Sequence, residues 1–158
     1  MPDLNLGELT ISCPSLGSDA AIPERHAAGG ENVPPTLEWS NVPEGTAELV
    51  LIAHDPDAPL TDGFTHWVVH GIDPATSGLE EGKPRGGGEP VTGPNEVGET
   101  AYMGPAPPGG HGRHHYFFHL YALDEPLDRS KPRSRDELLE KMDGHIIEQA
   151  RVVGYYEQ

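Results

Sequence analysis

Residues 47–59 read AELVLIAHDPDAP, a stretch in which an apolar run leads into two aspartates set between prolines. The run over residues 47–53 predicts a strand, and the prolines that follow it end any strand pairing. The same prolines fix the backbone that carries Asp55 and Asp57. A generic aspartate–proline turn explains one aspartate and one proline. Two of each in alternation favour a rigid loop that presents both carboxylates for function.

Three other segments predict strands. Residues 4–11 alternate apolar and polar side chains, and residues 66–72 and 116–123 are rich in aromatic and β-branched residues. The 20 glycines and 17 prolines are spread along the chain, which favours short segments joined by turns. No amphipathic stretch long enough for a crossover helix separates these segments. We therefore expect a mainly β protein, folded as an antiparallel β-sandwich.

The C-terminal part predicts helices packed on that sandwich. Ser134 stands three residues before Glu137 in the pattern of a capping box, and an apolar face follows as far as Gly144. A second short helix is expected over residues 145–149. Residues 150–155 alternate well enough to form a final strand. The expected fold is thus a β-sandwich with short C-terminal helices.

The length of the chain fits one domain covering residues 1–158. It has no apolar run long enough to span a membrane and no basic, apolar leader, so we expect a cytoplasmic protein without a membrane span. Its single cysteine, Cys13, excludes an intrachain disulfide and is expected to be structural. Residues 80–99 are rich in glycine and proline, and they read equally well as an exposed lid or as a plain connection.

The chain is strongly acidic, with 26 acidic and 10 basic residues and a formal net charge of -16. Such a surface repels phosphate backbones, so we expect no nucleic-acid partner. Only three of the basic residues are lysines. A dispersed acidic, lysine-poor surface favours solubility in concentrated salt, which makes a halophile the hypothesis for the source. An ordinary acidic mesophilic protein is the alternative.

Histidines mark the starts of two predicted strands. His66 and His70 are four residues apart, so regular alternation places both on one face, and Asp55 is expected to accept a hydrogen bond from His66. His70 taken alone reads as a surface or core-edge histidine. His114 and Tyr116 share one face of the later strand. Their ring nitrogens and hydroxyl suit a phosphate, sulfate or carboxylate ligand.

A stiff arch precedes that strand, with prolines between glycines over residues 104–110. Glycines allow backbone amides to point into a concavity, as in the backbone nests that hold anions. The arch therefore predicts that its backbone comes close to a ligand at the same site. Together these features indicate a pocket for a small anionic ligand.

On these motifs the chain resembles the phosphatidylethanolamine-binding protein family, in its bacterial and archaeal, Raf kinase inhibitor-like subgroup. The pairing of DPDAP with the downstream arch and histidine–tyrosine segment carries most of the resemblance, which covers nearly the whole chain. The matching stretches are Ile22-Pro23, GENVPP from Gly30, LEW from Leu37, DPDAP from Asp55, FTHWVVHGI from Phe64, the segment from Gly104 to Tyr116, FHLYALD from Phe118 and GHIIEQARVVGYY from Gly144.

The resemblance implies an antiparallel β-sandwich whose small cavity binds phosphate-like head groups, such as phosphoethanolamine or phosphorylated residues, without metal or cofactor. Carried onto this sequence, the implied pocket residues are Asp55, Asp57, Pro59, His66, Gly104, Pro105, His114 and Tyr116. Two positions depart from the family pattern. His115 stands in place of the arginine of His-Arg-Tyr, which makes a bracing contact to an acidic neighbour pH-dependent. Ala106 stands in place of a cysteine, which removes a thiol from the arch.

Three functional hypotheses follow. The leading one is a non-enzymatic protein that binds a small anion or phosphorylated ligand, with affinity rising as the pH falls. A metal-dependent hydrolase is the alternative, because four histidines (His111, His114, His115 and His119) lie close in sequence and the two aspartates would complete a ligand set. The third is a regulator of a protein partner such as a kinase or protease. A homodimer is kept as an alternative to a monomer.

Overall fold

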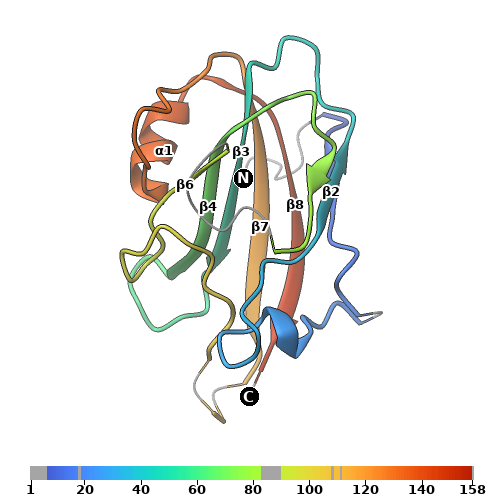
Figure 1. Cartoon of the computed structure of the whole chain (residues 1–158), viewed down its shortest axis with the longest axis vertical. Helices are drawn as coiled ribbons and strands as arrows, with labels where there is room; N and C mark the ends of the chain where they lie inside the picture. Colours follow the sequence, from blue (N-terminus) through green and yellow to red (C-terminus); the bar gives the residue numbers. More distant parts are fainter. Residues whose placement is uncertain (1–6, 18, 83–89, 108, 111, 158) are drawn as a thin grey trace.

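In the computed structural model, strand β3 (Glu48–Asp55) is the central strand of a five-stranded sheet (Figure 1). The structure describes residues 7–17, 19–82, 90–107, 109–110 and 112–157. Their other elements are β1 (Thr10–Ser12), the 3-10 helix η1 (Glu24–His26), β2 (Leu37–Ser40), β4 (Phe64–Ile72), β5 (Gly78–Leu79), β6 (Val91–Thr92), β7 (His114–Leu123), α1 (Arg135–Met142) and β8 (Ile146–Tyr156).

The elements form a sandwich of two antiparallel sheets, which confirms the predicted fold class. The large sheet has the order β6-β4-β3-β7-β8, and the small one has the order β1-β2-β5. Helix α1 lies on one side of the large sheet and β2 on the other (Figure 1). Every residue of β3 is buried, because both faces of this strand are covered. That two-sided burial is the reason its sequence is a continuous apolar run.

The two faces of β3 belong to two different hydrophobic clusters. Leu49, Leu51 and Ala53 pack between the sheets, in a cluster that also holds Cys13. Val50 and Ile52 pack beneath α1 on the outer face. Burial raises the pKa of the Cys13 thiol, which keeps it protonated. The cysteine thus occupies the structural position expected of it.

Helix α1 begins as predicted at the Ser134 capping box. Glu137 N donates to Ser134 Oγ at 3.2 Å, and Ser134 N donates to Glu137 Oε1 at 3.3 Å. These reciprocal bonds satisfy two backbone N–H groups that have no partner within the helix. Leu138 and Met142 are fully buried against the large sheet. The cap therefore helps to anchor the helix that covers the outer face.

The prediction of a second helix over residues 145–149 is wrong. These residues belong mostly to β8, which pairs with β7 from Tyr156 opposite His114 to Glu148 opposite Ala122 and, after a register shift, at Ile146 opposite Leu123. A local helical pattern of a few residues is a weak preference, and this long antiparallel ladder overrides it. In the described part of the chain, α1 is the only α-helix. The plural C-terminal helices of the expected fold are corrected to one.

Two other expected segments change in extent. Of the strand expected over residues 4–11, residues 4–6 lie outside the described part, and β1 covers Thr10–Ser12. Of the loop expected over residues 80–99, residues 83–89 also lie outside it. Val91 and Thr92 form β6 on the edge of β4, and Asn95 is buried. Residues 91–95 are therefore packed against the sheet, whereas residues 96–99 are exposed.

Replacing Ser134 by alanine removes the cap of α1. We expect Ser134→Ala to lower the free energy of unfolding by about 1 kcal/mol, because the Glu137 N–H at the start of the helix loses its acceptor. Urea unfolding followed by tryptophan fluorescence measures this change. Ser77→Ala, at an exposed loop serine, is the matched control and should leave the midpoint unchanged. Equal midpoints for the two variants would contradict the role given to the cap.

Candidate functional site

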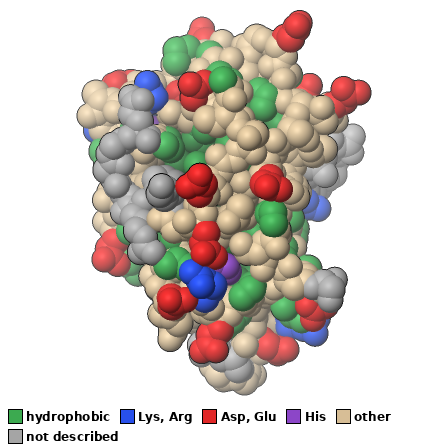
Figure 2. Space-filling view, turned by 45° about the vertical axis from the view of Figure 1, so that its right-hand side comes forward, with side chains coloured by type: hydrophobic (Ala, Val, Ile, Leu, Met, Phe, Trp, Pro, Cys, Tyr) green, Lys and Arg blue, Asp and Glu red, His purple; other side chains and the backbone are tan. Residues whose placement is uncertain are grey.

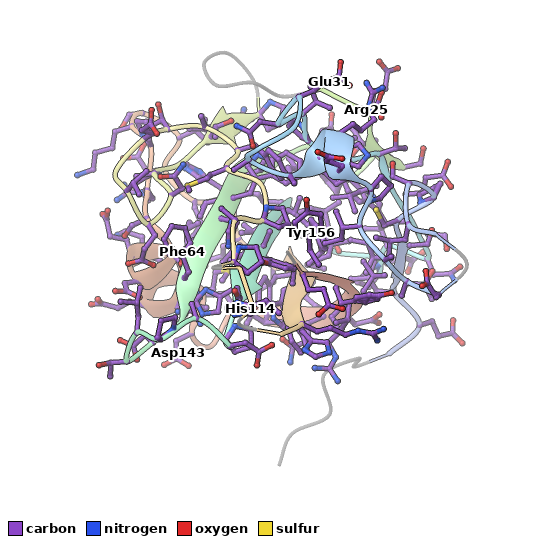
Figure 3. The ribbon with its side chains drawn as sticks, turned by 90° about the horizontal axis from the view of Figure 1, so that it is seen from below. Arg25, Glu31, Phe64, His114, Asp143 and Tyr156 are labelled. Atoms are coloured by element: carbon purple, nitrogen blue, oxygen red, sulfur yellow. The ribbon has the colours of Figure 1, made fainter. Side chains whose placement is uncertain are left out.

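A small cavity of about 130 Å³ lies at the end of the sandwich where β3 ends and β4 and β7 begin. Antiparallel pairing brings these three strand ends together, since both neighbours of β3 run opposite to it. Figure 3 looks onto this end of the molecule, with Phe64 and His114 labelled. The cavity is lined by Asp55, Ala58, Pro59, Phe64, His66, Met103, Ala106, Pro107, His114 and Tyr116.

The best-defined interaction of the site is a hydrogen bond between two buried side chains. His114 Nδ1 donates to Asp55 Oδ2 at 2.7 Å, and the two side chains are only 4% and 3% exposed. Because an ionised carboxylate only accepts, the proton of this bond belongs to the His114 ring. The second carboxylate oxygen, Asp55 Oδ1, accepts from Asp57 N at 2.7 Å. Asp55 thereby fixes both the histidine and its own loop.

A β-bulge turns His66 into the cavity. Ala53 lies opposite Trp67 and His54 lies opposite Thr65, so His66 is an extra residue in β4. A bulge re-aims a side chain, and here it places His66 beside Trp67 on the inner side of the sheet.

His70 lies on the other face of the sheet, where its Nε2 accepts from Arg133 N at 3.2 Å. The expectation that His66 and His70 share one face is therefore wrong, because it assumed regular alternation through the bulge.

The partner expected for His66 is also corrected. His66 Nδ1 donates to the carbonyl oxygen of Met103 at 2.7 Å, whereas Asp55 bonds to His114. Burial lowers the pKa of His66, outweighing the opposite effects of the Met103 carbonyl and the Asp55 charge. The neutral ring is favoured, with its hydrogen on Nδ1.

Tyr116 completes the polar part of the cavity. Its ring is 3% exposed and meets the His66 ring edge-on, with 5.1 Å between the ring centroids. Burial raises the pKa of Tyr116 well above its usual value, and the charges of Asp55 and Asp57 raise it further. The hydroxyl therefore stays protonated and is able to donate a hydrogen bond.

The proline–glycine arch closes one side of the cavity, but through different residues from those expected. Met103, Ala106 and Pro107 line the cavity, whereas Gly104 and Pro105 do not. Their predicted contact with a ligand stays a prediction.

In the structure, Gly104 and Pro105 hold the arch to residues 24–33, on which Figure 3 labels Arg25 and Glu31. Gly104 N donates to Asn32 Oδ1 at 2.7 Å, and Pro105 O accepts from Ala28 N at 2.9 Å. The Asn32 contact joins two segments that are far apart in sequence.

Asp57 lies outside the cavity lining and braces the loop that carries Asp55. Its Oδ2 accepts from His115 N at 2.8 Å and from His115 Nδ1 at 2.9 Å. Partial burial opposes ionisation of Asp57, but the two hydrogen bonds from His115 hold its pKa below the usual value. His115 thus makes the contact with an acidic neighbour that the family pattern implies for an arginine at this position.

The other histidines do not gather into a metal site within the described part of the chain. His115 points outward to Asp57, and His119 stacks between Phe117 and Tyr121 on the outer face of β7. His111 lies outside the described residues. No group of three or more potential ligands among the described residues is placed to hold a metal ion.

Sequence reasoning missed Phe64 and Met103 as parts of the site. Phe64 contacts the His66 ring at 4.7 Å between centroids, and Met103 supplies the carbonyl that orients it. Phe64 begins the same strand as His66, and Met103 directly precedes the arch. Their positions next to predicted site segments were the only signal, since their residue types are those of ordinary core residues.

His115→Ala should raise the pKa of Asp57 toward the ordinary aspartate value, because one of its two stabilising hydrogen bonds is lost. A carboxyl whose pKa is depressed by folding stabilises the fold above its unfolded pKa, and this contribution is lost as the pH falls through the folded pKa. Carbon-13 NMR of the Asp57 carboxyl gives its titration directly. His145→Ala, which removes a pairing with Asp124 at the far end of β7, is the control. An unchanged Asp57 titration in His115→Ala would refute the brace.

Gly104→Ala should destabilise the arch, because an added Cβ would overlap the His26 carbonyl oxygen. Such overpacking typically costs about 1–3 kcal/mol. Gly109→Ala is the control within the same arch, since a Cβ there meets nothing within 4 Å. Thermal unfolding of the two variants measures the difference. A Gly104→Ala variant as stable as Gly109→Ala would show that the contact with residues 24–33 is loose.

Comparison with solved structures finds the same architecture in two bacterial proteins. A phosphatidylethanolamine-binding protein homologue, CT736 of Chlamydia trachomatis, superposes with a TM-score of 0.86 at 36% identity, covering 95% of this chain and 97% of that one. YbcL of Escherichia coli, described as a new member of the mammalian PEBP family, superposes with a TM-score of 0.88 at 28% identity, covering 96% and 99%.

Sequence comparison agrees with the structural one. A UPF0098 protein of Methanothermobacter thermautotrophicus is 45% identical over 138 residues, which cover 85% of this chain and 89% of the relative. LppC of Mycobacterium tuberculosis, whose name describes a lipoprotein, is 39% identical over 94% of this chain and 72% of its own length. The family model named phosphatidylethanolamine-binding protein matches residues 13–157. The chain therefore belongs to the phosphatidylethanolamine-binding protein family.

Proposed function

We propose that this protein binds a small anion of the phosphate or phosphoethanolamine type in the cavity lined by Asp55, His66, His114 and Tyr116. The observation that carries the proposal is the buried His114–Asp55 hydrogen bond at the cavity wall. A histidine whose Nδ1 is held by a carboxylate presents its other ring nitrogen in a fixed direction. Tyr116 adds a protonated hydroxyl to the same wall.

The charge of the molecule supports a ligand that is not purely anionic. Acidic side chains are scattered over the face shown in Figure 2, with few basic ones among them. Long-range attraction therefore cannot recruit an anion, and short hydrogen bonds inside the cavity must supply the affinity. A ligand such as phosphoethanolamine carries an ammonium group as well, which an acidic surface favours. The same acidic surface supports the proposal of a halophilic source.

Binding without catalysis is the form of this proposal that the cavity supports. Its described lining includes no serine, threonine, cysteine or lysine, and its polar side chains are Asp55, His66, His114 and Tyr116. The carbonyl of Met103 occupies His66 Nδ1, and the carboxylate of Asp55 occupies His114 Nδ1. These two bonds fix the orientation of both rings.

The proposal extends to the protein's partners and to its location in the cell. We propose that a kinase- or protease-type protein partner would engage the molecule beside the cavity. No helix in the described part of the chain is long and apolar enough to cross a membrane. We propose a cytoplasmic location, which the single unpaired Cys13 favours. A homodimer stays an alternative to a monomer.

Isothermal titration of phosphoethanolamine at pH 6 tests the proposed function. His114→Ala should weaken binding by about tenfold or more, equivalent to about 1.4 kcal/mol, because it removes a ligand contact and leaves the Asp55 carboxylate without its partner. His145→Ala, at the other end of the molecule, should bind like the wild type. The proposal fails if the wild type does not bind, or if all three proteins bind equally.

A further inference from the structure

We infer that the cavity selects a ligand that carries its own proton, with His66 Nε2 as the acceptor of that proton's hydrogen bond. The ligand class is a singly protonated phosphate monoester, and a sulfate ester of the same shape is excluded. This inference rests on the proposed function and adds to it the protonation state of the ligand.

The tautomer of His66 follows from its hydrogen-bond partner. A backbone carbonyl only accepts, so the 2.7 Å contact to Met103 O requires a hydrogen on His66 Nδ1. In a neutral imidazole that carries its hydrogen on one nitrogen, the other nitrogen is an acceptor. The acceptor is Nε2, on the far side of the ring from Met103. Because His66 lines the cavity, Nε2 is the nitrogen left for a ligand.

The surroundings of His66 favour this neutral state. Asp55 and His54 approach from β3, His114 and Tyr116 from β7, and the backbone of Met103 and Gly104 from the arch. The ring is 6% exposed, and its burial lowers the pKa of His66; the Met103 carbonyl, the Asp55 charge and the Gly104 backbone offset this only in part. A positively charged ring is therefore disfavoured at neutral pH.

The buried carboxylate adds to this selection. Asp55 lies in the same cavity wall and already holds His114 through a hydrogen bond. A fully ionised phosphate monoester would bring two charges of the same sign close to that carboxylate, which is unfavourable in a poorly solvated cavity. A singly ionised ester brings one charge and one hydrogen-bond donor. The donor meets His66 Nε2, while the anionic oxygens meet the protonated Tyr116 hydroxyl.

Phosphate and sulfate monoesters have similar shapes but differ in whether they carry a proton near pH 6. A phosphate monoester gains its second charge at a pKa of about 6, so near that pH a large fraction still carries a P–OH donor. A sulfate monoester has no proton to donate in the same pH range. Its oxygen would face the His66 lone pair without a hydrogen bond between them, and buried polar groups left unpaired are costly. The two esters thus act as a matched pair of probes.

Calorimetric titration of O-phosphoethanolamine and of 2-aminoethyl hydrogen sulfate, each between pH 5 and pH 8, tests the inference in the full-length protein. The phosphate ester should bind about tenfold or more tightly than the sulfate ester at pH 6. Its affinity should fall as the pH rises above about 6, following the singly protonated fraction. At pH 8, titration in buffers of different ionisation enthalpy should show uptake of about one proton per ligand bound.

His66→Asn separates the two nitrogens of the ring. Asparagine keeps an N–H donor near the position of Nδ1 and lacks Nε2, so this variant should lose the preference for the phosphate ester. His145→Asn is the matched control and should keep the preference. Nitrogen-15 NMR of the wild-type His66 ring at pH 7 gives an independent reading that needs no variant. It should show one protonated and one unprotonated nitrogen.

The outcomes separate this inference from the function on which it rests. Equal affinity for the two esters at every pH overturns the inference and leaves anion binding in place. So does a His66 ring with both nitrogens protonated at pH 7, because the ring would then supply the proton. Failure of the wild type to bind either ester overturns the proposed function, and the inference falls with it.

Discussion

The antiparallel pairing of β3 with both of its neighbours is the constraint on which the rest of the structure depends. It places the last residue of β3 beside the first residues of β4 and β7, and these strand ends supply Asp55, Phe64 and His114. Both faces of β3 are covered, one by the small sheet and one by α1, so the strand has no freedom to shift its register. The position of the site is therefore fixed by the core.

Hydrogen bonds from three separate segments then fix the orientation of the polar groups around the cavity. Asp55 holds His114, Met103 holds His66, and Asn32 holds the backbone that follows Met103. Each of these bonds joins residues more than 30 positions apart in the chain. A preorganised group loses little conformational freedom when a ligand arrives, which suits a binding protein with few charged contacts to offer. The acidic exterior makes that preorganisation more important.

Much of this arrangement is predictable from the sequence, and the exceptions have physical reasons. The apolar run of β3, the DPDAP loop and the Ser134 cap are local signals, and the structure contains all three. The bulge at His66 is not a local signal, because it depends on how two strands are paired. The same is true of the Asp55–His114 partnership and of β8, whose ladder with β7 overrides a short helical pattern.

Because of the bulge, the fold and the pocket are able to change independently in evolution. His66 is the surplus residue between two regular pairs, so the ladder of β3 and β4 would be continuous without it. Loss of that one residue would leave the ladder continuous and remove the imidazole of His66 from the cavity. A related protein that lacks this residue would keep the fold and lose this part of the ligand site. A shared fold alone therefore does not show a shared function.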